Sequence, residues 1–225
     1  MFKTFTAALE SKIISFLTSN KEFFEMSKAE REKSLENISI PKTFKNYLLS
    51  ITGEQFMEDT TLIVAYIHSS QLVNIVKNPF FLSFLDFITD ELANKIDYLD
   101  SNFYLLKKIE RDEIALKLLP GESSLAQSLR EIIVNNTYQQ VAEEIHGIGS
   151  KVKNTPHILV QSPREINMEL KREIRHKLLK KHPSCLPVFQ VNRKLIGGIR
   201  IFENGQSTDN SWISRVFRFT SLTTN

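Results

Sequence analysis

The sequence contains one cysteine and no long run of apolar residues. The first shortage argues against a disulfide-stabilised protein, and the second argues against a transmembrane protein. The only cysteine among 225 residues is Cys185, so the chain cannot form a disulfide framework and a reducing compartment is favoured. Cys185 lies between two prolines in "HPSCLPV", where we expect a small apolar side chain at the start of a strand. No segment reaches about 18 consecutive apolar residues, so we expect no transmembrane helix. Lys3, Glu10 and Lys12 interrupt the N-terminus, which therefore does not resemble a signal peptide. A soluble, intracellular protein is expected.

Neither sign of charge dominates, because 29 Lys and Arg residues face 26 Asp and Glu residues, for a net charge of +3. The chain has no long basic run and does not interleave aromatic with basic residues, so nucleic-acid binding is not expected. The histidines lack the spacing of metal ligands: His68, His146, His157, His176 and His182. We predict a non-catalytic protein without cofactor or metal. An enzyme is the alternative, and turnover by the isolated chain would support it.

Glycine divides the chain into two parts. Only Gly53 and Gly121 precede residue 147, and the other five of the seven glycines lie between 147 and 205. The first part also holds most of the 16 phenylalanines, which we interpret mainly as core residues. Its first helix is indicated by apolar residues at helical spacing: Phe5, Leu9, Ile13 and Phe16. We predict an N-terminal helical bundle over residues 1–146.

Local signals mark where several of these helices begin. Ser27 and Glu30 match the S-x-x-E capping box, and Asn78-Pro79 is a strong helix start. A helix is predicted from about Ser123 to Ile145, whereas residues 103–118 fit either a helix or a hairpin. Residues 147–156, with two glycines and a proline, are predicted to be a linker.

A different pattern follows over residues 157–225. "HILVQ" predicts a strand, Ser162-Pro163 a helix cap, and "LPVFQV" and "IGGIRIF" two strands that pair as a hairpin around residues 192–194. Asn204-Gly205 predicts a turn, and Asp209, Asn210 or Ser211 caps a final helix. The order is β-α-β-β-α, and the predicted fold class is α+β.

The stretch "LIGGIRIFENGQSTDNSW" places two glycines inside a predicted strand. Gly197-Gly198 there indicates a bulge or the close approach of another backbone. A phosphate cradle is the other interpretation, but neither G-x-x-x-x-G-K-[ST] nor G-x-G-x-x-G is present.

This C-terminal region resembles the delta subunit of F-type ATP synthase, called the oligomycin-sensitivity-conferring protein in mitochondria. The matching positions are a four-residue block and a spaced Asp-x-Ser: Leu195, Ile196, Gly197, Gly198, Asp209 and Ser211. The order and spacing of the preceding strand, helix and strand also match, so the resemblance covers about residues 157–222.

The resemblance implies a non-catalytic stator in the peripheral stalk, which resists rotor torque so that proton transport is coupled to ATP synthesis. The N-terminal domain would bind alpha subunits of the catalytic head, and the C-terminal domain would bind the stalk's b subunits. Candidate contact residues are Arg172, Arg175 and Trp212. The expected location is the cytoplasmic face of the inner membrane, with membrane association only through the complex. The E-type stalk protein of vacuolar-type ATPases, flagellar-export stator proteins and a generic helical adaptor remain alternatives.

Overall fold

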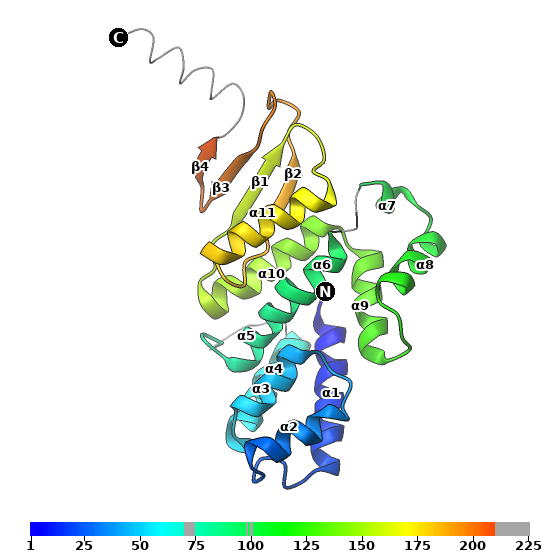
Figure 1. Ribbon diagram of the computed structural model, residues 1–225, viewed down its shortest axis with the longest axis vertical. Coiled ribbons are helices and arrows are strands. Elements are labelled where there is room, and N and C mark those ends of the chain that lie inside the picture. The colour runs from blue at the N-terminus through cyan, green and yellow to red at the C-terminus, as the bar shows by residue number, and fades with distance from the viewer. Residues whose placement is uncertain (70–74, 98, 100, 210–225) are drawn as a thin grey trace.

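The computed structural model describes residues 1–69, 75–97, 99 and 101–209, which form an α+β structure as predicted (Figure 1). The helices that precede the sheet are α1 (Lys3–Ser19), α2 (Lys28–Glu36), α3 (Lys42–Ser50), α4 (Gly53–Ser69), α5 (Pro79–Asp86), the π-helical turn η1 (Phe87–Leu92), α6 (Ala93–Ile96), α7 (Ser101–Leu105), α8 (Lys108–Leu118), α9 (Ser124–Asn135) and α10 (Tyr138–Lys153). The C-terminal part comprises β1 (Ile158–Ser162), α11 (Met168–Lys181), β2 (Val188–Val191), β3 (Arg200–Glu203) and β4 (Gln206–Asp209). None of the helices in these ranges combines the length and the apolar character needed to cross a bilayer.

The predicted helix starts are confirmed by their capping contacts. The Ser27 hydroxyl accepts from the backbone N–H of Glu30, and the Glu30 carboxylate accepts from the backbone N–H of Ser27 at 2.9 Å. The Asn78 side chain accepts from the N–H of Phe81 at 3.1 Å and begins α5. Each contact supplies a partner to backbone donors that a helix leaves free at its first turn.

Residues 103–118 contain no hairpin, because they form the end of α7 and the whole of α8. The prediction of a single helix from Ser123 to Ile145 is wrong. Asn136 is extended and Thr137 caps a second helix, accepting from the N–H of Gln140 at 3.2 Å. This capping box made of Thr and Gln divides the segment into α9 and α10.

The linker predicted at 147–156 is helical as far as Lys153, and one of its two glycines has a packing role. A side chain on Gly149 would collide with the Thr155 hydroxyl. Helix α10 ends only at Asn154, whose φ of 53° is left-handed. The chain therefore passes from helix to sheet within a few residues, and α10 also contacts β2.

One hydrophobic core joins the helices to part of the sheet. Phe2, Phe5, Phe84 and Phe87 are buried, and the rings of Phe5 and Phe87 stack with centroids 5.2 Å apart. The same core includes Leu186 and Val188 at the start of β2. The phenylalanines of the helical part are thus mainly core residues, as predicted, and the sheet is built onto their core.

The sheet has the order β2-β1-β3-β4, so the predicted hairpin between β2 and β3 is wrong. Strand β1 pairs parallel with β2 and antiparallel with β3. Helix α11 makes the crossover that the parallel pair requires. Because β3 pairs with the other side of β1, β2 is left at the edge. The predicted turn at Asn204-Gly205 joins β3 to β4, with φ of 50° and 84°, as in a type I′ hairpin turn.

Two further predictions for this part need correction. Asn167, and not Ser162-Pro163, caps α11, since its side chain accepts from the N–H of Leu170 at 2.9 Å. Asp209 closes strand β4 and so lies at the end of a strand that was not predicted. The predicted final helix, with Ser211 and Trp212, lies outside the described residues.

Candidate functional site

The Leu195–Gly198 block forms a loop between β2 and β3, so its glycines are not inside a strand as predicted. Gly197 and Gly198 have φ of 68° and 72°, a left-handed conformation that disfavours any residue with a Cβ atom. Leu195 is buried, whereas Ile196 is 64% exposed. The two glycines therefore turn the chain in consecutive left-handed positions and leave Ile196 on the surface.

Replacement of either glycine by alanine should strain this loop. We expect Gly197→Ala and Gly198→Ala each to lower the free energy of unfolding by about 1–2 kcal/mol, the cost of a left-handed L-residue. Gly147→Ala is the control, because a Cβ there meets open space within helix α10 and should stabilise the protein by about 0.5–1 kcal/mol. Denaturant titration measures all three variants. Equal behaviour of the loop and helix variants would contradict this account.

Two hollows lie at the carboxyl ends of β1 and β2, on either side of the loop of residues 163–167. The first, of about 400 Å³, is lined by Gly197, Gly198 and Leu170 among others. Leu170 is 42% exposed, so this hollow has an apolar rim next to the exposed Ile196. The carboxyl ends of parallel strands are the common place for a binding site in an open sheet.

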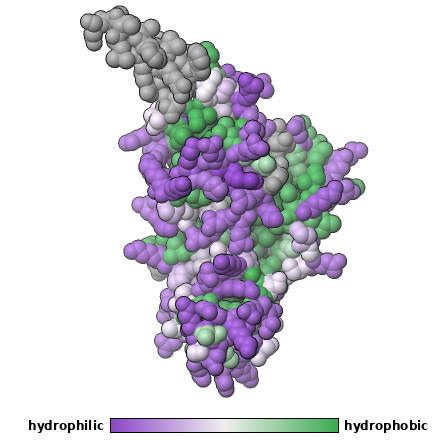
Figure 2. Space-filling model, in the orientation of Figure 1, coloured by the Kyte–Doolittle hydropathy of each residue, from purple (hydrophilic) through white to green (hydrophobic). Residues whose placement is uncertain are grey.

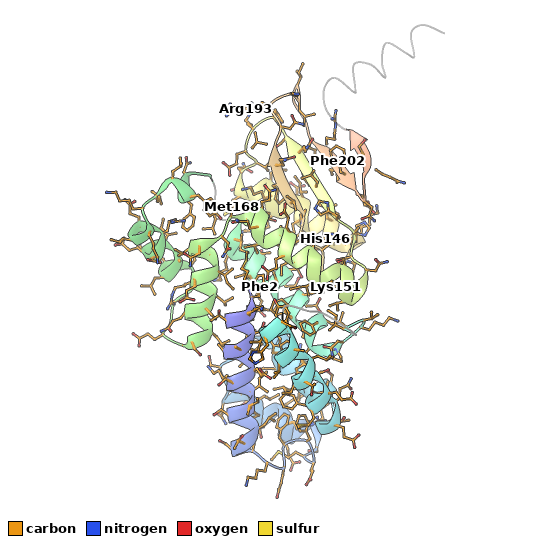
Figure 3. The ribbon with its side chains drawn as sticks, turned by 180° about the vertical axis from the view of Figure 1, so that it is seen from behind. Phe2, His146, Lys151, Met168, Arg193 and Phe202 are labelled. Atoms are coloured by element: carbon orange, nitrogen blue, oxygen red, sulfur yellow. The ribbon has the colours of Figure 1, made fainter. Side chains whose placement is uncertain are left out.

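The second hollow is a cleft of about 470 Å³ between the sheet and the helices. Its walls come from the start of α10, from α7, from the 163–167 loop and from β2. Arg164 and Arg193 are exposed at this cleft, and Lys171 is a buried wall residue whose Nζ lies 3.5 Å from a carboxylate oxygen of Glu165. Figure 3 places Arg193 at the end of the sheet remote from α1. The sequence places Arg164 and Lys171 among the basic residues of the segment 164–181, but it does not predict Arg193 as their neighbour, because only the sheet order brings them together.

Arg175 is not on a solvent-facing side of α11, so its prediction as a partner contact is wrong. The side chain is 1% exposed, and its Nη1 lies 2.5 Å from Oδ2 of Asp97. Its Nη2 donates to the Asn94 side chain at 2.7 Å. Burial raises the pKa of Asp97, and the adjacent Arg175 opposes that shift. Arg172, the other arginine predicted as a contact, is half-buried on the same helix.

Further polar contacts tie the two parts of the molecule. The Tyr138 hydroxyl of α10 donates to the carbonyl of Pro187 at 2.9 Å. The Ser184 hydroxyl donates to the Asp86 carboxylate at 2.7 Å. Together with the Arg175–Asp97 pair, these contacts hold α11 and the start of β2 against α5, α6 and α10.

Exposed apolar side chains also occur on the helical part. Ile14 of α1 and Met57 and Val64 of α4 are 41%, 67% and 41% exposed, and α1 packs beside α4. A larger apolar area covers α7, α8 and α9 (Figure 2), where Leu105, Ile109 and Leu116 are exposed. Both areas lie far along the chain from the Gly197-Gly198 loop.

Cys185 is buried beside Ile158 and Val160, and burial raises the pKa of its thiol to about 12, in keeping with the expected packing role. Within the part of the chain that the structure describes, no three His, Cys, Asp or Glu residues could hold a metal ion together.

No protein-family model matches the sequence, and no curated protein matches it.

Proposed function

We propose that this chain is a non-catalytic stator subunit of a proton-translocating F-type ATP synthase, which links the catalytic head to the b-subunit stalk. One observation carries the proposal: two of the surfaces with exposed apolar side chains, one on α1 and α4 and one at the end of the sheet, belong to parts joined by a buried ion pair. A protein that resists torque needs two binding surfaces and a stiff connection between them. The resemblance of residues 195–198 and 209 to the delta subunit supports the same interpretation.

The helical surface is the proposed contact for alpha subunits. Ile14, Met57 and Val64 offer apolar contacts on two adjacent helices. An amphipathic helix binds such a surface with apolar residues spaced every three or four positions. This fits a partner that contributes a short terminal helix.

The sheet surface is the proposed contact for the b subunits. Leu170 and Ile196 supply exposed apolar area beside the hollow at Gly197 and Gly198. Arg164 and Glu165 both lie in the lining of the same hollow, so a stalk segment with polar groups beside its apolar residues would be complementary to it. Arg175 has no part in this contact, since it is buried in the connection between the two surfaces.

The connection itself supports a mechanical role. Arg175 and Asp97 form a buried ion pair between α11 and the end of α6, and the half-buried Asn94 accepts a hydrogen bond from Arg175. The hydrophobic core runs from the helices into β2. A continuous, close-packed core transmits strain with little compression. The molecule would therefore hold head and stalk at a fixed separation on the cytoplasmic face of the inner membrane.

Copurification with separate surface variants tests the proposal. We expect the chain, co-expressed with alpha and b subunits, to copurify with both. Ile14→Asp with Val64→Asp should abolish only alpha binding, and Leu170→Asp with Ile196→Asp only b binding, because a charge introduced into an apolar contact is left without a partner. All four positions are exposed, so the melting temperature should be nearly unchanged.

Four results would count against this proposal in whole or in part. Binding to neither the alpha nor the b subunits would refute it, and loss of both partners by either double variant would refute the division of surfaces. Substrate turnover by the isolated chain would support an enzyme. Copurification with rod-like stalk proteins of another rotary machine would support the vacuolar-type or flagellar-export alternative.

A further inference from the structure

Strand β2 is an edge of the sheet, because the order β2-β1-β3-β4 leaves one of its sides without a neighbouring strand. The N–H of Asn192 donates to the carbonyl of Ser162 at 2.7 Å. Since successive residues of a strand alternate, Gln190 also turns its backbone groups toward β1, and Phe189 and Val191 turn theirs to the free side. The carbonyl of Pro187 agrees with this alternation, because it faces α10 and accepts from Tyr138.

The backbone groups of Phe189 and Val191 have no hydrogen-bond partner among the residues that the structure describes. Both residues line the cleft of about 470 Å³. Natural proteins usually cover or blunt such an edge, whereas here a cleft runs beside it. An extended peptide hydrogen-bonds to a free edge of this kind by adding a strand.

The basic side chains of the cleft favour an acidic peptide. Arg164, Lys171 and Arg193 line it and Glu165 is its only acidic side chain in the described lining, which leaves an excess of positive charge. Leu99 and Ile166 add apolar wall. An occupant with acidic residues between apolar ones would meet both features.

A second copy of this chain fits the edge poorly. Two copies of an edge strand related by a two-fold axis pair antiparallel, so Val188–Val191 of the second copy would lie along this cleft. That strand carries no acidic side chain to match the excess of positive charge at the cleft. The edge is therefore better suited to a different polypeptide.

We propose that the cleft binds an extended, acidic segment of a partner protein, which adds to the free edge of β2. This inference goes beyond the proposed stator function and does not depend on it. The cleft and the Gly197-Gly198 hollow lie on opposite sides of the 163–167 loop. The bound segment of the partner is a strand here and not a helix.

Fluorescence anisotropy with synthetic peptides tests the proposal on the full chain. The probe is a short labelled peptide of alternating Val and Glu, and it is compared with a Val and Lys peptide of equal length. A third peptide repeats the Val and Glu sequence with every backbone amide N-methylated, which removes the donors of both strand edges and keeps the charge. We expect saturable binding of the first peptide only, because the contact needs both acidic side chains and backbone donors.

Matched charge reversals locate the site. Arg164→Glu with Arg193→Glu should raise the dissociation constant by about tenfold or more, since complementary charges at the contact are reversed. Lys28→Glu with Lys33→Glu makes the same charge change on the exposed face of α2 and should leave binding unchanged. Val191→Pro removes an outward N–H from an edge position that tolerates proline and should also weaken binding.

Several outcomes would overturn the proposal. These are equal binding of the N-methylated peptide, which would mean charge attraction alone, and equal binding of the Val and Lys peptide. An unchanged dissociation constant in the Arg164 and Arg193 variant would also do so. So would a dimer of the unliganded chain that Val191→Pro dissociates, because the edge would then be occupied by a second copy.

Discussion

Arg175→Leu is expected to lower the free energy of unfolding by about 3–5 kcal/mol, the typical cost of removing one partner from a buried ion pair. The Asp97 side chain is 0% exposed and its partner Arg175 1% exposed, so neither charge can turn to water. Without the guanidinium, Asp97 keeps the burial that raises its pKa and loses the cation that opposes the shift. Asn94 also loses the donor at its side-chain oxygen.

The pH dependence of this variant has a defined sign. A carboxyl whose pKa is higher in the folded than in the unfolded state binds its proton more tightly when folded, so stability is greatest below the unfolded pKa and falls as pH rises through the folded one. Arg175→Leu raises the folded pKa of Asp97 further. Acidification from neutral pH should therefore recover part of the lost stability relative to the parent protein, as urea titration at several pH values would measure.

Two further variants separate the ion pair from general effects. Lys180→Leu makes the same change at an exposed position of α11 and should cost little, within about 0.5 kcal/mol. The double variant Arg175→Leu with Asp97→Leu removes both charges and should be more stable than Arg175→Leu alone, because no uncompensated charge remains. If the single variant matched Lys180→Leu, the pair would not connect the two parts as described.

Helix caps and turns of this fold were predictable because the residues that contact each other in them are close in sequence. The capping box of Ser27 and Glu30 and the start at Asn78 depend on contacts three residues apart. The turn at Asn204-Gly205 depends on two adjacent backbone conformations that Asn and Gly favour. For these caps and this turn, the types of neighbouring residues are enough to predict the backbone conformation.

Features set by distant contacts were not predictable in the same way. Arg175 resembles the other cations of α11, and only Asp97, 78 residues away, distinguishes it. The strands "LPVFQV" and "IGGIRIF" are separated by a loop that suits a hairpin, yet β3 pairs with β1. The basic cleft followed from that pairing, since it exists only where β2 is the edge.

A second buried polar cluster, within the helical part, should be almost as sensitive as the ion pair. The Tyr47 hydroxyl donates to Oδ2 of Asp59 at 2.7 Å, and the Asn78 side-chain amide donates to Oδ1 at 2.5 Å. All three residues are less than one tenth exposed. Asp59→Ala leaves two buried donors unsatisfied, each at a cost of about 1–3 kcal/mol, so a total loss of about 3 kcal/mol or more is expected.

Conservative and matched variants show whether the hydrogen bonds carry this effect. Tyr47→Phe removes one donor together with its demand for a partner and should cost about 1 kcal/mol. Glu58→Ala changes the neighbouring, exposed carboxylate on α4 and should cost less than about 0.5 kcal/mol. Equal losses for Asp59→Ala and Glu58→Ala in denaturant titration would contradict the cluster.

The protonation of Asp59 gives the same cluster a pH signature. Burial raises the pKa of Asp59 above 3.8, and the hydrogen bonds from Tyr47 and Asn78 oppose the shift without cancelling it. The contribution of this group is therefore complete below the unfolded pKa and declines as pH rises through the higher folded value. Asp59→Asn cannot titrate, so the stability difference between the parent protein and this variant should narrow as pH rises above about 4. A difference that widened with pH would mean that the folded state prefers the ionised carboxylate, with Tyr47 and Asn78 outweighing burial.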